Sequence, residues 1–230
     1  MAETHTLSPR RSLTTPRAAA VAGILFALLY GTGMVLIRLS IPADRATEIG
    51  AWLESDKGTL SLALNLVPYA GIAFLWFIGV IRDRMGELED RFFATVLLGS
   101  GLLFLAMTFA GAALAGGLLV SYTAGSNAAA DYNMFVYGRE VMFRVIYVYA
   151  LRMAGVFMIS LGTIWIRTGL MHRGWAFLTY ALALLLLIAI SRSLLVILVF
   201  PGWVLAVSAY FLIRNPQDQT QEEAGTSGAP

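Results

Sequence analysis

The sequence predicts an all-α protein, a polytopic bundle of six transmembrane helices with both chain ends in the cytoplasm. Three observations lead to this fold class. Hydrophobic residues make up 58% of the chain and charged residues 13%, against roughly 45–50% and about 25% in soluble domains. The charged residues gather between apolar runs of about the 20 residues that cross ~30 Å of hydrocarbon. Basic residues flank these runs, which is typical of the cytoplasmic loops of membrane proteins.

The first predicted span covers residues 18–37 and follows a polar cytoplasmic tail, residues 1–17, that we expect to be disordered. A signal peptide is the alternative, and the pair Arg10 and Arg11 resembles part of a twin-arginine signal. The apolar stretch is longer than the 7–15 residues of a signal-peptide core and lacks a small-residue cleavage site. A transmembrane helix is therefore favoured.

The second and third spans are predicted at residues 59–81 and 92–120. Pro42 prevents the first helix from continuing, and the charged residues of 40–58 indicate a solvated outer loop. Residues 82–91 form an abrupt, charge-dense cytoplasmic turn. This turn is a candidate docking site for a protein partner or anionic lipid, although a solvated turn with short ion pairs is the favoured interpretation.

The fourth span is predicted at residues 145–166, after tyrosines that favour the membrane interface. An earlier start, as a helix standing above the membrane, is left open. Spans five and six are placed at residues 175–190 and 194–213 with a turn at 191–193. A turn at Pro201 and Gly202 leaves too few residues to span, so Pro201 is placed inside the last helix. Residues 215–230 form a second disordered cytoplasmic tail, and 18–214 form the membrane domain.

Basic residues favour the cytoplasmic side in this layout. The inner side collects Arg10, Arg11, Arg17, Arg82, Arg84, Arg91, Arg167, Arg173 and Arg214. The outer side collects Arg38, Arg45, Lys57, Arg139, Arg144 and Arg192. The bias fits the positive-inside rule and predicts the orientation of the chain in the cell membrane. Because these residues flank spans and do not form a stripe, they give no support to nucleic-acid binding.

The residue inventory argues against an enzyme. The chain has no cysteine, its two histidines, His5 and His172, lie outside the spans, and no predicted span contains Asp or Glu. Haem, metal sites and coupled proton transport usually need such residues within the membrane. Ser100 between two glycines resembles the surroundings of a serine protease nucleophile, yet no span offers a histidine base. We expect no catalytic residue, no metal and no cofactor.

Small residues four apart on the first and third spans predict close helix packing. They are Gly23, Ala27 and Gly31 on the first, with Gly111/Ala115, Ala112/Gly116 and Ala113/Gly117 on the third.

One charged side chain lies inside a predicted span. Placing Arg152 near midspan costs ~2.5–3.5 kcal/mol on insertion scales, so it should not face lipid. Asn65 lies at a similar depth in the second span, and Pro68 frees the carbonyl of Leu64 beside it, with Tyr69 nearby. We therefore expect Arg152 to pack towards the second helix.

An outer vestibule is expected above this polar site, bordered by Asp131, Arg139, Glu140 and Arg144. The functional interpretation is recognition of an anionic solute or lipid headgroup, because a guanidinium binds carboxylate and phosphate well. The favoured alternative is structural, with Arg152 reaching the interface or bonding another helix.

Four apolar segments also suggest a family. They are AGILF (residues 22–26), LVPYAGIAFLWFIGV (66–80) leading into RDR (82–84), EDRFFAT (89–95) and PGWVL (201–205). Together they resemble uncharacterised six-helix membrane proteins, a domain of unknown function, of high-GC Gram-positive bacteria. The resemblance implies a fold and a location, and it carries no catalytic residues.

Two functions follow from these observations. The first is a non-enzymatic membrane component or accessory protein. The alternative is a transporter or channel for a small solute or lipid, with a polar cavity around Arg152 and Asn65. The lipid bilayer is the expected partner, and the sequence does not indicate an oligomeric state.

Overall fold

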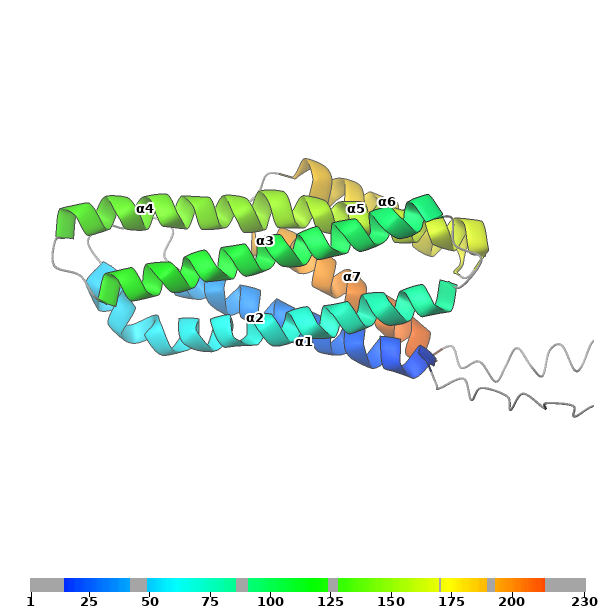
Figure 1. Cartoon of the computed structure of the whole chain (residues 1–230), viewed down its shortest axis with the longest axis horizontal. Coiled ribbons are helices and arrows are strands. Elements are labelled where there is room, and N and C mark those ends of the chain that lie inside the picture. Colours follow the sequence, from blue (N-terminus) through cyan, green and yellow to red (C-terminus); the bar gives the residue numbers. More distant parts are fainter. Residues whose placement is uncertain are drawn as a thin grey trace, which may run out of the picture.

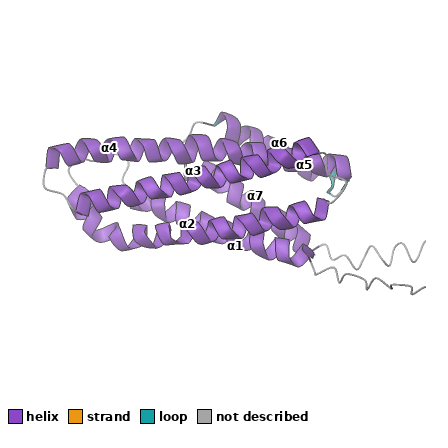
Figure 2. Ribbon diagram, in the orientation of Figure 1, coloured by secondary structure: helices purple, strands orange, loops and turns teal. Residues whose placement is uncertain are grey.

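The computed structural model describes residues 15–41, 49–85, 91–123, 128–169, 171–189 and 193–213, and in these ranges the backbone is almost wholly helical (Figure 2). The helices are α1 (Thr15–Ser40), α2 (Ile49–Met85), α3 (Arg91–Thr123), α4 (Ala128–Arg144), α5 (Leu151–Thr168), α6 (Arg173–Ile188) and α7 (Leu194–Ile213). A π-helical segment, η3 (Val145–Ala150), joins α4 to α5 without a break. The predicted all-α class is confirmed for this part of the chain.

The helices pack as a bundle elongated along the helix axes (Figure 1). Helix α1 packs against α2 and α7, and α3 packs against α5, α4 and η3. Helix α6 packs mainly against α5 and makes few contacts with α7. The start of α1 and the ends of α2, α5 and α7 all lie at one end of the bundle, on the right in Figure 1. We call this the terminal end.

Five helical stretches of the described residues are long and apolar enough to cross a membrane. They are Ala18–Ser40, Asp56–Arg82, Phe92–Val120, Asn133–Thr168 and Leu194–Ile213. Large apolar side chains also face outward, such as Trp76 at 68% and Leu195 at 77% exposure. A bilayer covers such surface without penalty, so the chain is a multi-pass membrane protein. Helix α6 is apolar but has only 16 residues, so the predicted sixth crossing stays a prediction.

Helix α6 ends at Ile188 and α7 begins at Leu194, and Pro201 lies inside α7 as predicted. The predicted turn at 191–193 falls between these helices, and residues 191 and 192 lie outside the described residues. One loop prediction is wrong, because α2 begins at Ile49, inside the predicted outer loop. Helix α4 begins at Ala128, before the predicted fourth span, as in the earlier start that the sequence left open. Both helices continue past their apolar stretches because a chain leaving a membrane can stay helical when its residues favour helix.

Several expectations concern other parts of the chain. Two sets of residues lie outside the described part of the chain. They are the predicted tails, except for the first residues of α1, and residues 86–90 in the middle of the predicted cytoplasmic turn.

Several helices are much longer than a bilayer is thick. The 17, 6 and 18 residues of α4, η3 and α5 form one continuous rod of about 60 Å, at ~1.5 Å per residue. Helix α2 has 37 residues and α3 has 33, or about 55 and 50 Å. Helix α6 ends, and α7 begins, part-way along the bundle (Figure 1). The excess length of α2, α3 and α4 therefore projects from the end opposite the terminal end, as a helical extension.

Aromatic rings fill the centre of the bundle. Measured between ring centroids, Phe74 lies 4.7 Å from Phe26, 5.3 Å from Phe104, 5.3 Å from Phe157 and 5.7 Å from Phe200. The five rings come from α2, α1, α3, α5 and α7 and are all fully buried. Such spacing is that of offset and edge-to-face ring packing. The bundle is closed at this level by these side chains.

The predicted close packing at small residues is confirmed at some sites and wrong at others. A Cβ on Gly23 would collide with the Ser208 hydroxyl of α7, and one on Gly111 would collide with Ile146 of η3. At Gly31 the nearest atom would be an ordinary 3.8 Å away, and a Cβ on Gly117 would meet nothing within 4 Å. Close approach therefore occurs where a neighbouring helix lies opposite the glycine, which spacing alone does not decide.

Candidate functional site

Arg152 lies near the start of α5 and bonds the end of α6. Its Nε donates a hydrogen bond of 3.3 Å to the backbone carbonyl of Leu187. This carbonyl is in the last turn of α6, where carbonyls lack partners within their own helix. A guanidinium at a helix C-terminus also interacts favourably with the helix dipole. Arg152 therefore caps α6.

The local sequence explains why Arg152 faces α6. Helices α5 and α6 are joined by a short connection and run antiparallel, with Gly155 against Ala183 and Gly162 against Thr179. A Cβ on Gly155 would lie 3.1 Å from the Ala183 carbonyl oxygen, so the backbones are close here. Arg152 precedes Gly155 by about one turn and lies on the same face. The glycine brings the arginine within reach of Leu187.

The structure does not bring Arg152 together with Asn65 and Tyr69, and the predicted packing of Arg152 towards the second helix is replaced by its contact with α6. Helix α2 packs against α1 and α3. Asn65 is exposed, and Tyr69 is 63% exposed. Asn65 lies 17 residues before Arg82 on α2, or about 26 Å towards the extension. Because that depth is near the far face of the ~30 Å hydrocarbon core of a bilayer, the Asn65 side chain needs no buried partner.

The four residues expected to border an outer vestibule all lie on α4. Arg139 Nη2 lies 3.6 Å from Glu140 Oε1, and both side chains are half-buried. Arg144 is exposed. The side chain of Asp131 is outside the described residues. Because one helix carries all four, they follow the rod, and the vestibule stays a prediction.

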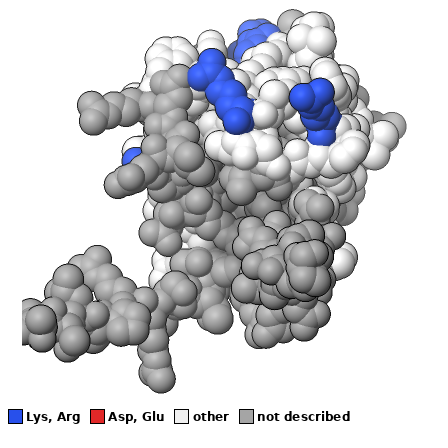
Figure 3. Space-filling model, turned by 90° about the vertical axis from the view of Figure 1, so that its right-hand side faces the viewer, with Lys and Arg blue, Asp and Glu red and all other residues white. Residues whose placement is uncertain are grey.

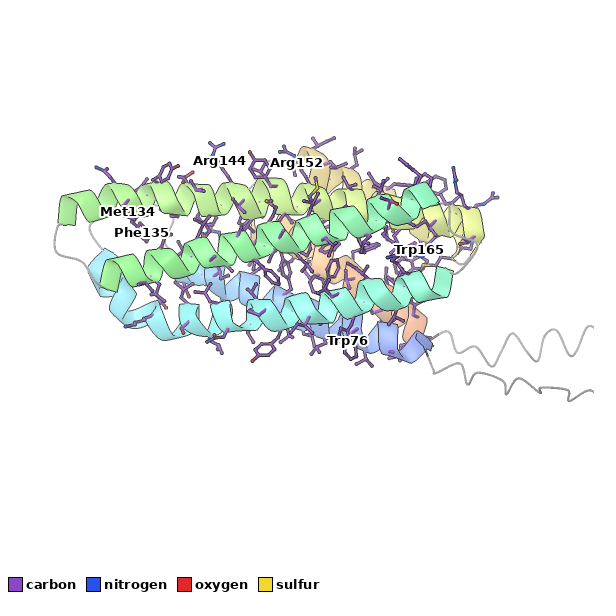
Figure 4. The ribbon with its side chains drawn as sticks, in the orientation of Figure 1. Trp76, Met134, Phe135, Arg144, Arg152 and Trp165 are labelled. Carbon is purple, nitrogen blue, oxygen red and sulfur yellow. The ribbon has the colours of Figure 1, made fainter. Side chains whose placement is uncertain are left out.

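The π-helical segment changes which residues of the rod share a face. Arg144 and Arg152 are eight residues apart, which in a regular α-helix turns the second side chain by about 80° from the first. A π-turn holds an extra residue, since its hydrogen bonds run from i to i+5. Eight residues that include η3 therefore complete about two turns. Figure 4 shows both arginines along the same outer side of the rod.

Neighbouring side chains on α4 show that the extension is packed. Phe135 is 5% exposed and Met134 is 61% exposed, and Figure 4 places Phe135 between α4 and α3. A Cβ on Gly138 would meet Leu118 of α3 at 2.6 Å, so the two helices are close. The extension therefore continues the packed bundle.

Exposed arginine side chains lie near the terminal end. Arg82, Arg167 and Arg173 lie near it and are exposed. The guanidinium of Arg167 lies 4.7 Å from the centroid of the Phe93 ring, a cation–π contact between α5 and α3. Figure 3 looks on to this end and shows basic side chains and, among the described residues, no acidic one. No group of three or more metal-binding side chains occurs in the described part of the chain.

Comparison with protein-family models, with curated proteins and with solved structures found no match.

Proposed function

We propose that the chain is a non-enzymatic accessory protein of the cytoplasmic membrane, crossing it six times with both ends inside and acting through its surfaces. The observation that carries this proposal is the aromatic centre. At the middle of the bundle, the centroid of the Phe74 ring of α2 lies within 5.7 Å of the centroids of rings from four other helices. A solute moving along the bundle axis would have to displace them.

The buried polar groups favour an accessory protein that acts through its surfaces over a protein that conducts a solute. Buried polar side chains of the described residues are the hydroxyls of Ser40, Ser100, Thr108, Ser160, Thr179 and Ser208. The hydroxyls of Ser100, Ser160 and Thr179 bond carbonyls of their own helices, whereas the buried hydroxyls of Ser40, Thr108 and Ser208 form no hydrogen bond within the described residues. Side chains that satisfy their own backbone do not form a polar path between the two faces.

The extension supports action outside the membrane. If the terminal end lies at the cytoplasmic interface, as its basic side chains favour, about half of the ~60 Å rod of α4, η3 and α5 stands beyond a ~30 Å hydrocarbon core. The outer face of α4 exposes Met134 and Tyr137, at 61% and 73%. Exposed aromatic and Met side chains are common at protein contacts. A second contact at the cytoplasmic residues 82–91 remains part of the proposal.

A flux assay tests this proposal against transport. The purified full chain is reconstituted into vesicles of phosphatidylethanolamine and phosphatidylglycerol, and efflux of entrapped chloride and phosphate is measured. We expect the native chain to match empty vesicles for both ions. Saturable efflux that falls on Arg152→Ala, but not on the exposed Arg173→Ala, would overturn the accessory role and favour a transporter.

A further inference from the structure

We propose that Arg144 and Arg152 together bind the phosphate of an anionic glycerophospholipid in the outer leaflet, on a ledge formed where α6 ends beside the continuing rod. This rests on the proposed function only in placing the chain in a bilayer with its terminal end inside. The site is defined as Arg144, Arg152 and the last turn of α6.

The depth of the two arginines fits the outer interface. Arg152 lies 16 residues before the end of α5, which is about 24 Å from the terminal end of that helix. Arg144 lies about 12 Å further out, within the headgroup layer of a bilayer about 40–45 Å thick overall. Side chains of a helix tilt towards its N-terminus, which here is the outward direction. The Arg152 guanidinium therefore reaches up towards the headgroups.

The donors of Arg152 are only partly used within the protein. Its Nε bonds the Leu187 carbonyl, which fixes the plane of the guanidinium. Arg carries five N–H donors, four of them on the two terminal nitrogens. Among the described residues these terminal nitrogens have no bonded acceptor, and the exposed Arg144 has none either. A phosphate oxygen suits both groups, since guanidinium binds phosphate in a bidentate manner.

The π-helical segment places both guanidinium groups on one side. Without the extra residue of η3, Arg144 would point about 80° away from Arg152. With it, both lie along the same outer side of the rod in Figure 4. π-turns inside α-helices are frequent at functional sites. The irregular turn therefore builds a two-arginine surface that a regular helix would separate.

The ledge also offers surface for acyl chains. Helix α6 stops at Ile188, whereas η3 and α4 continue outward beside it (Figure 1). On α6, Leu184 and Ile188 share a face four residues apart and are 55% and 67% exposed. Tyr149 of η3 is 56% exposed, and tyrosine prefers the headgroup level. A lipid with its phosphate at the arginines has its chains along apolar side chains.

Lipid retention measures this site directly. The purified full chain is equilibrated in detergent with phosphatidylglycerol or phosphatidylcholine, and bound lipid is counted by native mass spectrometry. We expect a preference for phosphatidylglycerol that falls about tenfold in Arg144→Gln, the effect of losing one charged hydrogen-bonding group. The matched control Arg173→Gln makes the same charge change at the terminal end and should leave the preference intact.

Two further results decide the proposal. Arg152→Gln should lower the preference for phosphatidylglycerol as Arg144→Gln does. If Arg152 only capped α6 and bound no lipid, Arg144→Gln would have no effect on this preference. Equal loss in Arg144→Gln and Arg173→Gln, or no loss in either, would overturn the site. Displacement of the lipid by millimolar inorganic phosphate would show a soluble-anion site in its place. Because binding is read without flux, this test can fail while the proposed function stands.

Discussion

The indole Nε1 of Trp203 in α7 donates a hydrogen bond of 2.9 Å to the Oγ1 of Thr179 in α6. The hydroxyl of Thr179 in turn donates to the Trp175 carbonyl at 2.8 Å, so one buried oxygen links the indole N–H to a backbone carbonyl. Helices α6 and α7 otherwise make few contacts. This bond therefore fixes the position of the shortest helix against the last one.

Replacing Thr179 with Val should lower stability by about 1–2 kcal/mol, because the Trp203 N–H then stays buried without an acceptor. The measurement is unfolding of the purified chain in mixed micelles of increasing SDS content. Trp203→Phe removes the donor and tests the same bond from the other side. If the two residues act through this bond, the double variant should cost less than the sum of the single ones. Strict additivity would contradict the bond.

The close approach of α5 to α6 at Gly155 makes a second prediction. An added Cβ at Gly155 would lie 3.1 Å from the Ala183 carbonyl oxygen and 3.2 Å from Leu187 Cγ. Gly155→Ala should destabilise the chain by about 1–3 kcal/mol, since a backbone atom cannot give way as a side chain does. At Gly79 a Cβ meets nothing within 4 Å, so Gly79→Ala is the control and should be neutral or stabilising by up to ~1 kcal/mol. The same SDS titration reports both, and equal effects would refute the packing argument.

Hydropathy located the helices but not their full lengths. The second span was predicted at residues 59–81, and α2 runs from Ile49 to Met85. An apolar window ends where the bilayer ends, whereas a helix ends where its backbone or side chains stop it. Residues 49–58 are polar yet contain good helix formers such as Ala51, Leu53 and Glu54. The extension was therefore outside what apolar length can reveal.

Depth in the membrane does not identify the neighbour of Arg152, because the connectivity of the helices decides which helix faces it. Asn65 and Arg152 lie at similar depths, but the short link between α5 and α6 makes α6 the neighbour of the face that carries Arg152. Gly155, three residues after Arg152, was the available signal for close packing there. The π-helical turn that aligns Arg144 has no recognised signature in Val145–Ala150. Its alignment could come only from the structure.

The aromatic centre should be the most sensitive part of the bundle. Phe200 contacts Phe26, Phe74, Phe104, Phe157 and Trp203, with centroid distances of 4.8–6.1 Å. Phe200→Ala should cost about 3–5 kcal/mol through the cavity it leaves. Phe177 on α6 is 66% exposed, and Phe177→Ala should change stability by less than about 0.5 kcal/mol because lipid covers either side chain. Similar losses in both variants would show that the rings do not form the core.

The number of crossings depends on α6, and single cysteines decide it because the native chain has none. Arg173 begins α6, and Ser193 follows its end; both are exposed. If α6 crosses, Ser193→Cys reacts with an impermeant maleimide from outside intact cells, and Arg173→Cys reacts only after permeabilisation. Asn133→Cys on the exposed surface of α4 is the control for the outer side and should react without permeabilisation. Reaction of Ser193→Cys and Arg173→Cys on the same side would mean that α6 does not cross.

The 16 residues of α6 reach about 24 Å, and a thinned bilayer or flanking polar side chains can accommodate that length at a modest cost. Capping of its last turn by Arg152 lowers that cost further, since it satisfies the Leu187 carbonyl at the depth where water is scarce.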